Sequence, residues 1–372
     1  MLDAPFARRA AAPLRRPTCA VAFAGAPARG SGFGGPPTVP AAVSSLFPGA
    51  RGDPWARSVT RITVESTLAP NVSYAEVDVA GGGDGPVVAV GDEGTIALGF
   101  HGDRLDTVFT GAVHSVTSTG RGAARLVALD GGAVLAHERV ETSFEGRSAG
   151  DIVRALAAEA GVAVGTIERG VDLPFVAIDA ARSVWAHLAV LARASGHWVF
   201  VGPDGRLQFV RVRAGQPAAR FEYGDDVLAI ERTSAAAAFG AVTVGGEGAA
   251  GTAGMNAWAT LVKDPAPVTS GVGSGGVRRF SIAALRSQDA VRTAAAGIAE
   301  ATARLAEYGE VLVAGAPSVA AGATIEIDAA ERGFGGTYLV TEVRHTFESR
   351  RGFLSRIRFT GQGAPTRPWG GL

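Results

Sequence analysis

Apolar and polar residues alternate with a period of two along much of the chain, which predicts short β-strands. The strands expected in the first part of the chain are 59–64, 75–79, 91–100 and 108–113. Those expected later are 221–223, 227–231, 241–244, 311–313, 324–327, 339–347 and 353–360. Glycine-rich turns separate them, and short strands at this spacing favour small β-barrels or sandwiches.

Three segments have apolar residues at helical spacing instead. Ser148, with an acid three residues later, resembles a capping box and predicts a helix that stops at Gly161. Asp179 can cap a second helix that ends at Gly196, where a left-handed C-cap needs a residue without Cβ. A third helix is expected over 286–308, and its narrow stripe of small residues predicts close packing against another element.

The second helix opens a compact unit over residues 179–209. A strand follows at His197–Val201, and Pro203–Gly205 has the residues of a tight turn. Leu207 and Phe209 then alternate as a returning strand. Every signal in this stretch favours the same helix–hairpin arrangement.

In spacing and residue type this unit resembles the late control protein D family, the baseplate hub of contractile phage tails. It also resembles the hub portion of type VI secretion spike proteins. The matching positions are Trp185, Leu188, Gly196, Asp204 and Leu207. Two flanking segments are similar to the first barrel and the closing hairpin of that family, namely 91–113 and 336–359.

The resemblance covers roughly residues 55–362 and implies a structural, non-enzymatic protein without cofactors. It implies an α+β, mainly β fold with two small tube-like β-barrel domains and an α/β insert. It further implies a homotrimer in which two barrels per chain form a pseudo-sixfold ring. The implied partners are the tail tube protein, other baseplate components and a separate spike protein, since spike-fused members continue well beyond the last barrel strand.

The expected organisation has five parts. Residues 1–50, rich in Ala, Pro, Gly and Arg without any period, predict a flexible or extended arm rather than part of a core. The remaining parts are a first β-barrel over 55–140, an α/β insert over 141–215, a second β-barrel over 216–362 with a mobile loop at 245–280 and the helix at 286–308, and a tail over 363–372.

Composition excludes several partner classes. The chain has 372 residues with 35 basic and 35 acidic side chains, so no net field attracts nucleic acid or an anionic membrane. Cys19 is the only cysteine, which excludes an intrachain disulfide. The apolar run 19–24 superficially resembles a signal or transit peptide, but it is short, only weakly apolar and flanked by prolines. We therefore expect synthesis in the cytoplasm and assembly into a tail or injection particle.

Two alternative functions are a secreted β-rich binding module and a serine hydrolase that uses Ser148. Gly146–Gly150 matches the G-x-S-x-G pattern around Ser148, but the preceding residues are polar and a helix N-cap explains the serine. Residues 30–35 and 271–276 both match G-x-G-x-x-G, the dinucleotide-binding fingerprint, but neither segment follows a buried strand. The six histidines lack the spacing of zinc ligands. We expect no catalytic, cofactor or metal residues, and we take Trp258 and Trp369 as candidates for partner contacts.

Overall fold

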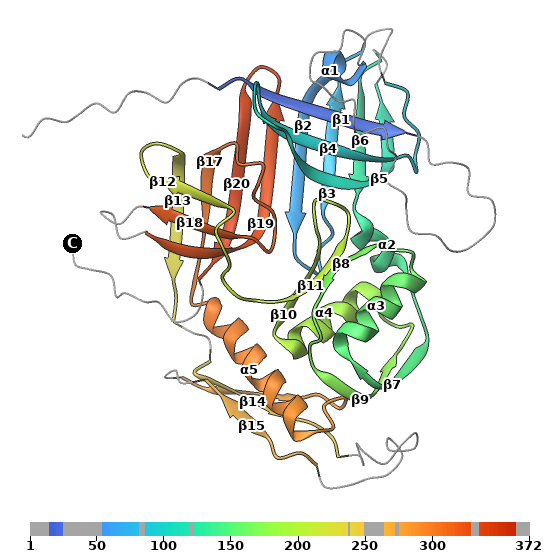
Figure 1. Ribbon diagram of the computed structural model, residues 1–372, viewed down its shortest axis with the longest axis vertical. Helices are drawn as coiled ribbons and strands as arrows, with labels where there is room; N and C mark the ends of the chain where they lie inside the picture. The colour runs from blue at the N-terminus through green and yellow to red at the C-terminus, as the bar shows by residue number, and fades with distance from the viewer. Residues whose placement is uncertain are drawn as a thin grey trace, which may run out of the picture.

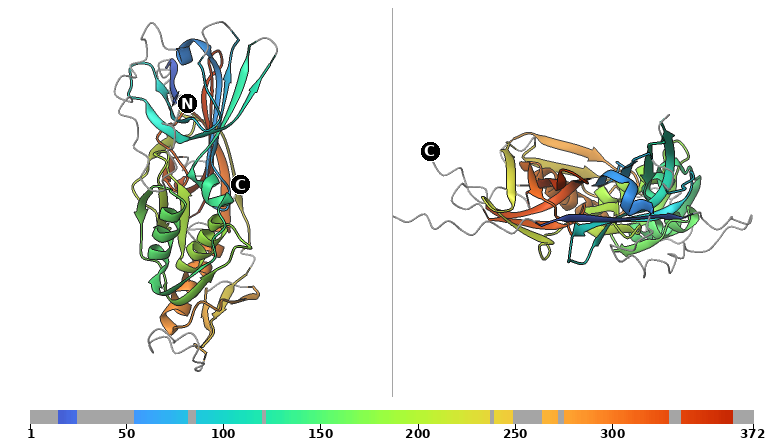
Figure 2. Two further views of the ribbon diagram at one scale, coloured as in Figure 1. Left: turned by 90° about the vertical axis from the view of Figure 1, so that its right-hand side faces the viewer. Right: turned by 90° about the horizontal axis from the view of Figure 1, so that it is seen from above.

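The computed structural model describes residues 15–24, 54–81, 86–119, 122–236, 239–248, 264–271, 275–328 and 335–361. The molecule is elongated, with a large curved sheet at one end and helices with small sheets at the other (Figures 1 and 2). The mainly β, α+β fold that the sequence predicts is confirmed.

The large sheet has twelve strands that come from two parts of the chain. The N-terminal set is β1 (Pro17–Ala24), β2 (Val59–Thr67), β3 (Tyr74–Val79), β4 (Glu93–Phe100), β5 (Asp106–Ser118) and β6 (Ala124–Leu129). The C-terminal set is β12 (Ala219–Glu222), β13 (Val227–Ser234), β17 (Glu307–Ala314), β18 (Thr324–Asp328), β19 (Gly336–Glu348) and β20 (Gly352–Thr360). We call these sets the N-terminal arc and the C-terminal arc.

The two arcs come from the segments for which two barrels were predicted, 55–140 and 216–362, and in the structure they share one ladder of hydrogen bonds. Within the described residues the ladder runs β1–β4–β5–β6–β3–β2–β19–β20–β17–β13, and β18 links β19 to the parallel strand β12. The arcs meet where β2 pairs antiparallel with β19, from Thr67 opposite Glu342 to Arg61 opposite Glu348. A shared pair of strands, rather than a linker, therefore joins them.

Alternation explains why each arc has one buried and one polar face. In β3, Ala75, Val77 and Val79 are buried, whereas Glu76 and Asp78 lie on the other face. The buried apolar side chains of the sheet form one cluster in each arc, and Phe347 and Phe353 of the C-terminal arc extend the N-terminal cluster across the joint. The small helix α1 (Pro54–Ser58) covers part of the N-terminal cluster.

An α/β unit lies below the arcs (Figure 1), and most of it comes from the 141–215 segment predicted as an insert. Its strands β8, β10 and β11 form one sheet, and β7 pairs with β9. Its elements are α2 (Gly131–His137), β7 (Thr142–Ser148), α3 (Ala149–Glu159), β8 (Val164–Ile167), β9 (Asp172–Ile178), α4 (Val184–Ser195), β10 (His197–Val201) and β11 (Leu207–Arg211). Ile152 on α3 and Leu188 on α4 are fully buried in its core.

The predicted ends of these helices hold with one correction. Ser148 caps α3, because its hydroxyl accepts the Asp151 N–H at 3.2 Å. The cap of α4 is Ser183 and not Asp179, whose carboxylate accepts a backbone N–H in the turn before the helix. Gly196 ends α4 with φ of +66°, as a left-handed C-cap requires.

Helix α5 (Gln288–Arg304) corresponds to the predicted 286–308 helix, and its small residues pack closely. The contact is with the C-terminus of α4, since a Cβ on Gly297 would lie 2.6 Å from the Cα of Gly196. The prediction that this helix and the 241–244 strand belong to the second barrel is wrong. Both complete the core of the α/β unit, because their apolar faces fit that core and not the C-terminal arc.

The small sheet that packs on α5 also corrects the predicted loop at 245–280. Its strands are β14 (Ala241–Gly245), β15 (Val268–Ser270) and β16 (Val277–Ser281). Strand β15 lies inside the predicted loop and β16 overlaps its end. Segments with few large side chains can still form strands when one face of their sheet packs on a helix. Positions 249–263 and 272–274 lie outside the described residues.

The predicted arm over 1–50 is wrong for residues 17–24. These form β1, the end strand of the N-terminal arc, and include the run that resembled a signal peptide. Val21 and Phe23 are buried in the apolar cluster of that arc, so two alternating anchors suffice to order the strand. The other positions of the arm, apart from Arg15 and Arg16, and the 363–372 tail lie outside the described residues.

Candidate functional site

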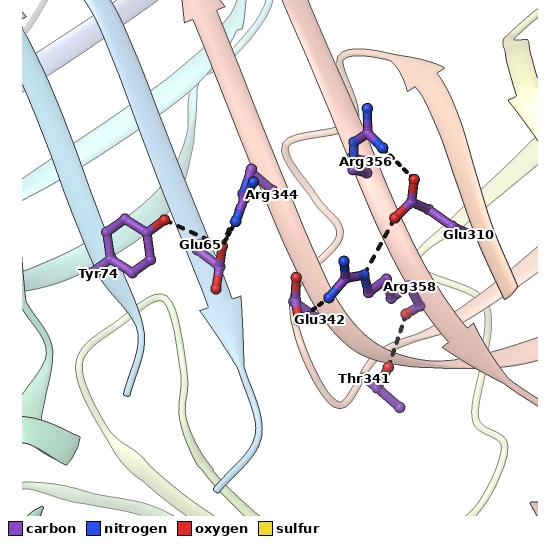
Figure 3. A network of polar contacts seen from close by, with 8 residues as sticks. All are labelled: Glu65, Tyr74, Glu310, Thr341, Glu342, Arg344, Arg356 and Arg358. Atoms are coloured by element: carbon purple, nitrogen blue, oxygen red, sulfur yellow. Dashed lines mark hydrogen bonds and ion pairs between the residues drawn. The ribbon is translucent and has the colours of Figure 1, made fainter. Parts of the chain in front are cut away.

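The outer face of the large sheet carries paired charges where the two arcs meet (Figure 3). Glu65 on β2 and Arg344 on β19 are directly opposite each other, and the guanidinium donates to the carboxylate through Nε at 2.9 Å and through Nη2. The hydroxyl of Tyr74 on β3 donates to the same carboxylate at 3.4 Å. Burial and the Glu65 charge raise the pKa of Tyr74, and the hydrogen bond to Glu65 raises the pKa of Arg344.

A second set of charges continues this face across the C-terminal arc. Glu310 on β17 accepts from Arg356 and from Nε of Arg358, the latter at 3.3 Å. Arg358 also donates to Glu342 on β19 at 3.1 Å. The charge of Glu342 and the hydrogen bond to Glu310 raise the pKa of Arg358. Three strands of this arc are thus tied through one arginine.

Opposite charges across the N-terminal arc complete the pattern. Arg125 on β6 makes a bidentate contact with Asp78 on β3, at 2.7 and 3.0 Å. Arg61 on β2 faces Glu348 on β19 at 3.9 Å. Exposed pairs of this kind each stabilise a fold by only about 0.2–1 kcal/mol. Their main effect is therefore to favour one register between the arcs and to keep this face hydrophilic.

The inner side of the same joint is fixed by a buried histidine. His345 is 1% exposed, and its Nε2 lies 3.0 Å from the Val319 carbonyl, which can only accept. Nε2 therefore bears the proton, and the Ser355 hydroxyl donates to Nδ1 over 2.8 Å. Burial lowers the pKa of His345 to about 4, so the ring is neutral at pH 7.

The Ser355–His345 pair has the hydrogen bond of a nucleophile and its base, but not the access. Ser355 is fully buried and its oxygen also accepts the Ala316 N–H at 2.8 Å. A substrate cannot reach a hydroxyl enclosed in this way, so the pair holds strands and loop together. The sequence did not predict this pair. The two residues are ten positions apart on the two strands of a hairpin, and their side chains meet only in the observed register.

Ser148, the candidate nucleophile of the alternative hydrolase function, is a helix cap in the structure. Its hydroxyl donates to the Asp151 carboxylate at 2.7 Å. Residues 142–147 of β7 before it are partly or fully exposed, unlike the buried strand that a nucleophile elbow needs. The hydrogen bond from Ser148 lowers the pKa of Asp151, as expected for a carboxylate at the start of a helix.

The other sequence candidates give no further site among the described residues. In that part of the chain no group of three or more His, Cys, Asp or Glu side chains is arranged to hold a metal ion. Trp258, Trp369 and residues 30–35 lie outside it, as does the centre of the 271–276 match. A search of the described helices also found none with the length and apolar character needed to cross a membrane.

Comparisons with known proteins agree on the fold. No family model matches the sequence, and no curated protein matches it. The fold is similar to the 43 kDa tail protein of prophage MuSo2 from Shewanella oneidensis, with a TM-score of 0.60 and 14% identity over 81% of this chain and 93% of that chain. It is also similar to a tail protein from Neisseria meningitidis MC58, with a TM-score of 0.61 and 14% identity over 83% of this chain and 95% of that one.

A third similar structure is the c3393 protein of E. coli, a component of the type VI secretion system with structural similarity to the T4 bacteriophage tail proteins gp27 and gp5. Its TM-score is 0.55 and its identity 10%, over 84% of this chain and 76% of that chain. These likenesses, each over more than four fifths of this chain, agree with the fold implied by the resemblance in the sequence.

Proposed function

We propose that the protein is the structural hub of a phage tail or of a related contractile injection system, where it joins the tail tube to the spike. The observation that carries the proposal is the fold shared with tail proteins over more than four fifths of the chain. Three copies, each with two joined arcs, present six similar arcs to a sixfold tube and three α/β units to a threefold spike. The chain is made in the cytoplasm and then enters the particle.

The joint between the arcs supports this arrangement. A ring that bears load along a tail needs the two arcs of each copy in a fixed relation, and a continuous ladder with a buried hydrogen-bonded histidine provides that. Ion pairs between neighbouring strands cover the outer face over the joint and the C-terminal arc, as suits a face in contact with water.

The test is to co-express the chain with spike and tube proteins from the same genome and to measure the mass of the purified assembly by mass photometry. We expect three copies of this chain per assembly. Obligate interfaces in such rings commonly bury more than about 2,000 Å². A stable assembly with one copy would overturn the proposal.

We further propose that the protein is not an enzyme and that Ser148 acts as a cap. Ser183 and Ser287 offer matched controls, because each caps its helix through the same 3.2 Å bond to the third N–H. Replacement of each serine by Ala should lower the free energy of unfolding by a similar amount, about 1 kcal/mol, and leave assembly intact. Labelling of Ser148 by a fluorophosphonate probe in the folded protein, without labelling of the other two, would contradict this.

A further inference from the structure

Strand β1 lies at one end of the large sheet and is held by β4. Its backbone pairs with β4 along its whole length, from Pro17 opposite Phe100 to Ala24 opposite Glu93. The ladder extends one step further, since the Arg16 carbonyl accepts the His101 N–H at 2.7 Å. An extended segment that adds to an exposed sheet edge in this way binds as strand-adding peptides do.

The edge of β4 is shaped for the side chain of Phe23. Gly94 lies beneath it, and a Cβ at this position would come within 2.4 Å of the Phe23 ring and 2.1 Å of the Ala22 carbonyl oxygen. The ring of Trp55 on α1 lies beside it, with the centroids 5.8 Å apart. Phe23 is 7% exposed in this notch. A glycine in a strand interior commonly marks such a close approach.

Further anchors lie within the strand and just before it. Val21 is 1% exposed and packs in the N-terminal cluster. Before the strand, Arg15 pairs with Asp103 and its guanidinium lies 4.8 Å from the centre of the Phe100 ring. Residues 17–24 contain no charge, so backbone pairing and these few side chains account for the binding.

The chain between β1 and α1 is far longer than this contact requires. Phe23 and Trp55 touch, so a few residues would suffice to connect their elements. Residues 25–53 lie between the two elements, and a connection of this length spans at most roughly 100 Å when extended. That is enough to reach a neighbouring copy, and exchange of an identical element between copies makes the same contacts at little cost.

We infer that β1 is an exchanged strand: in the assembled protein, β1 of one copy lies on β4 of the next, with its Phe23 in the notch formed by Gly94 and Trp55 of that neighbour. The inference rests on the proposed function only in that several copies must assemble. Three exchanged strands would tie the ring together through backbone hydrogen bonds, in addition to its side-chain interfaces.

A disulfide across the pair tests this directly. Ala22 and Thr95 are opposite each other and partly exposed, so Ala22→Cys with Thr95→Cys in a Cys19→Ala background should cross-link on oxidation. We expect two- and three-chain species on a denaturing gel without reductant, which revert to one chain with reductant. Thr18→Cys with Thr95→Cys in the same background is the control out of register, and it should not cross-link.

A shortened chain separates exchange from pairing within one copy. Deletion of residues 29–48 leaves nine residues between β1 and α1, which is enough for the contact of Phe23 with Trp55 and reduces the reach of the connection from roughly 100 Å to about 30 Å. In this variant the cross-link should shift from between chains to within a chain. Replacement of Gly94 by Val should fill the notch and abolish both kinds of cross-link.

The outcomes separate the two proposals. An assembled trimer whose cross-links all lie within single chains, or that forms none in register, would overturn the exchange and leave the hub function standing. A chain that never assembles with itself, in the presence of the spike and tube proteins, would overturn both. Cross-links between chains that persist after the deletion would also contradict an exchange through the long connection.

Discussion

The molecule has two joints that are built in different ways. Between the arcs, β2 and β19 form an unbroken backbone ladder with charges outside and His345 inside. Between the N-terminal arc and the α/β unit, in what we call the loop joint, single hydrogen bonds each connect a loop of one part to a strand or helix of the other. They run from the Ala69 N–H to the Val199 carbonyl at 3.0 Å, from Trp185 Nε1 to the Asn71 carbonyl at 3.1 Å, and from Thr110 Oγ1 to the Pro203 carbonyl at 2.8 Å.

This difference determines how each joint responds to load and to pH. A ladder fixes register along its whole length, whereas separate loop contacts can be lost one at a time. The loop joint also borders a small cavity that includes the carboxylate of Asp130. Burial raises the pKa of Asp130 to about 7, against the hydrogen bonds from Ser73 and the Gly132 N–H. The ladder joint instead holds a histidine that is neutral at that pH.

The largest effect should come from Trp185, which contributes both to the core of the α/β unit and to the loop joint. Trp185 is 3% exposed, so Trp185→Ala should lower the free energy of unfolding by about 3–5 kcal/mol in urea titrations. Trp185→Phe retains most of the buried ring and loses the hydrogen bond to Asn71, so it should cost about 1–2 kcal/mol. Val190→Ala on the exposed side of the same helix, where the side chain is 48% exposed, is the control and should change little. Melting of Trp185→Ala within a degree of wild type would show that this face is not packed.

The next effect concerns pH. The contributions of the two joints to the free energy of unfolding should change in opposite directions with pH. Folded Asp130 holds its proton up to pH about 7, whereas an unfolded Asp ionises near about 3.9, so the folded state binds more protons in between. Its contribution to stability therefore falls as pH rises through this window. Folded His345 titrates at about 4 against about 6.5 unfolded, so its contribution is lost as pH falls from about 6.5 to about 4.

The measurement is the urea midpoint of wild type, Asp130→Asn and His345→Gln at pH values from 4.5 to 8. Each unit of pKa difference corresponds to about 1.4 kcal/mol, so each group should change the free energy of unfolding by a few kcal/mol across its pH window. Asp130→Asn should remove the loss of stability toward pH 8. His345→Gln should lower stability at every pH and remove part of the loss toward pH 4.5. Parallel curves for all three proteins would refute the contrast between the joints.

The smallest effect should come from the charges over the ladder joint. A double-mutant cycle with Glu65→Gln and Arg344→Gln should give a coupling of about 0.5–1 kcal/mol that decreases at high salt. The Glu65 side chain is 16% exposed, whereas Arg169 and Asp172 form a pair at 73% and 64% exposure and serve as the control. Their coupling should be near zero. Equal couplings for the two pairs would show that the network over the joint adds nothing specific.

Sequence patterns predicted the elements whose signals are local. The alternation over 75–79 and the serine before α3 each require only a few neighbouring residues, and both are confirmed. The pattern over 241–244 is equally clear, but period two is the same whichever sheet a strand joins. The helix at 286–308 likewise predicted a close partner without indicating that this partner is Gly196.

The charged face shows the same limit. The acids on one face of the 75–79 strand are visible in the sequence, but the partner of each charge depends on register between strands far apart in the chain. Glu65 and Arg344 are separated by 279 positions, and no local signal connects them. Strand β1 was missed for another reason, since only Val21 and Phe23 mark it within a segment dominated by small residues, proline and arginine.

The distance along the chain between β2 and β19 has a consequence for biosynthesis. During translation, β2 leaves the ribosome long before the strand that covers its edge, and 279 residues at about 5–20 residues per second take roughly 15–55 s. For that time a nine-residue strand with an apolar face has one side without its native partner. The α/β unit waits as well, because α5 is made after the rest of its core. The edge of β2 therefore stays open to other strands until the last strands emerge, and the proposed ring cannot assemble before then.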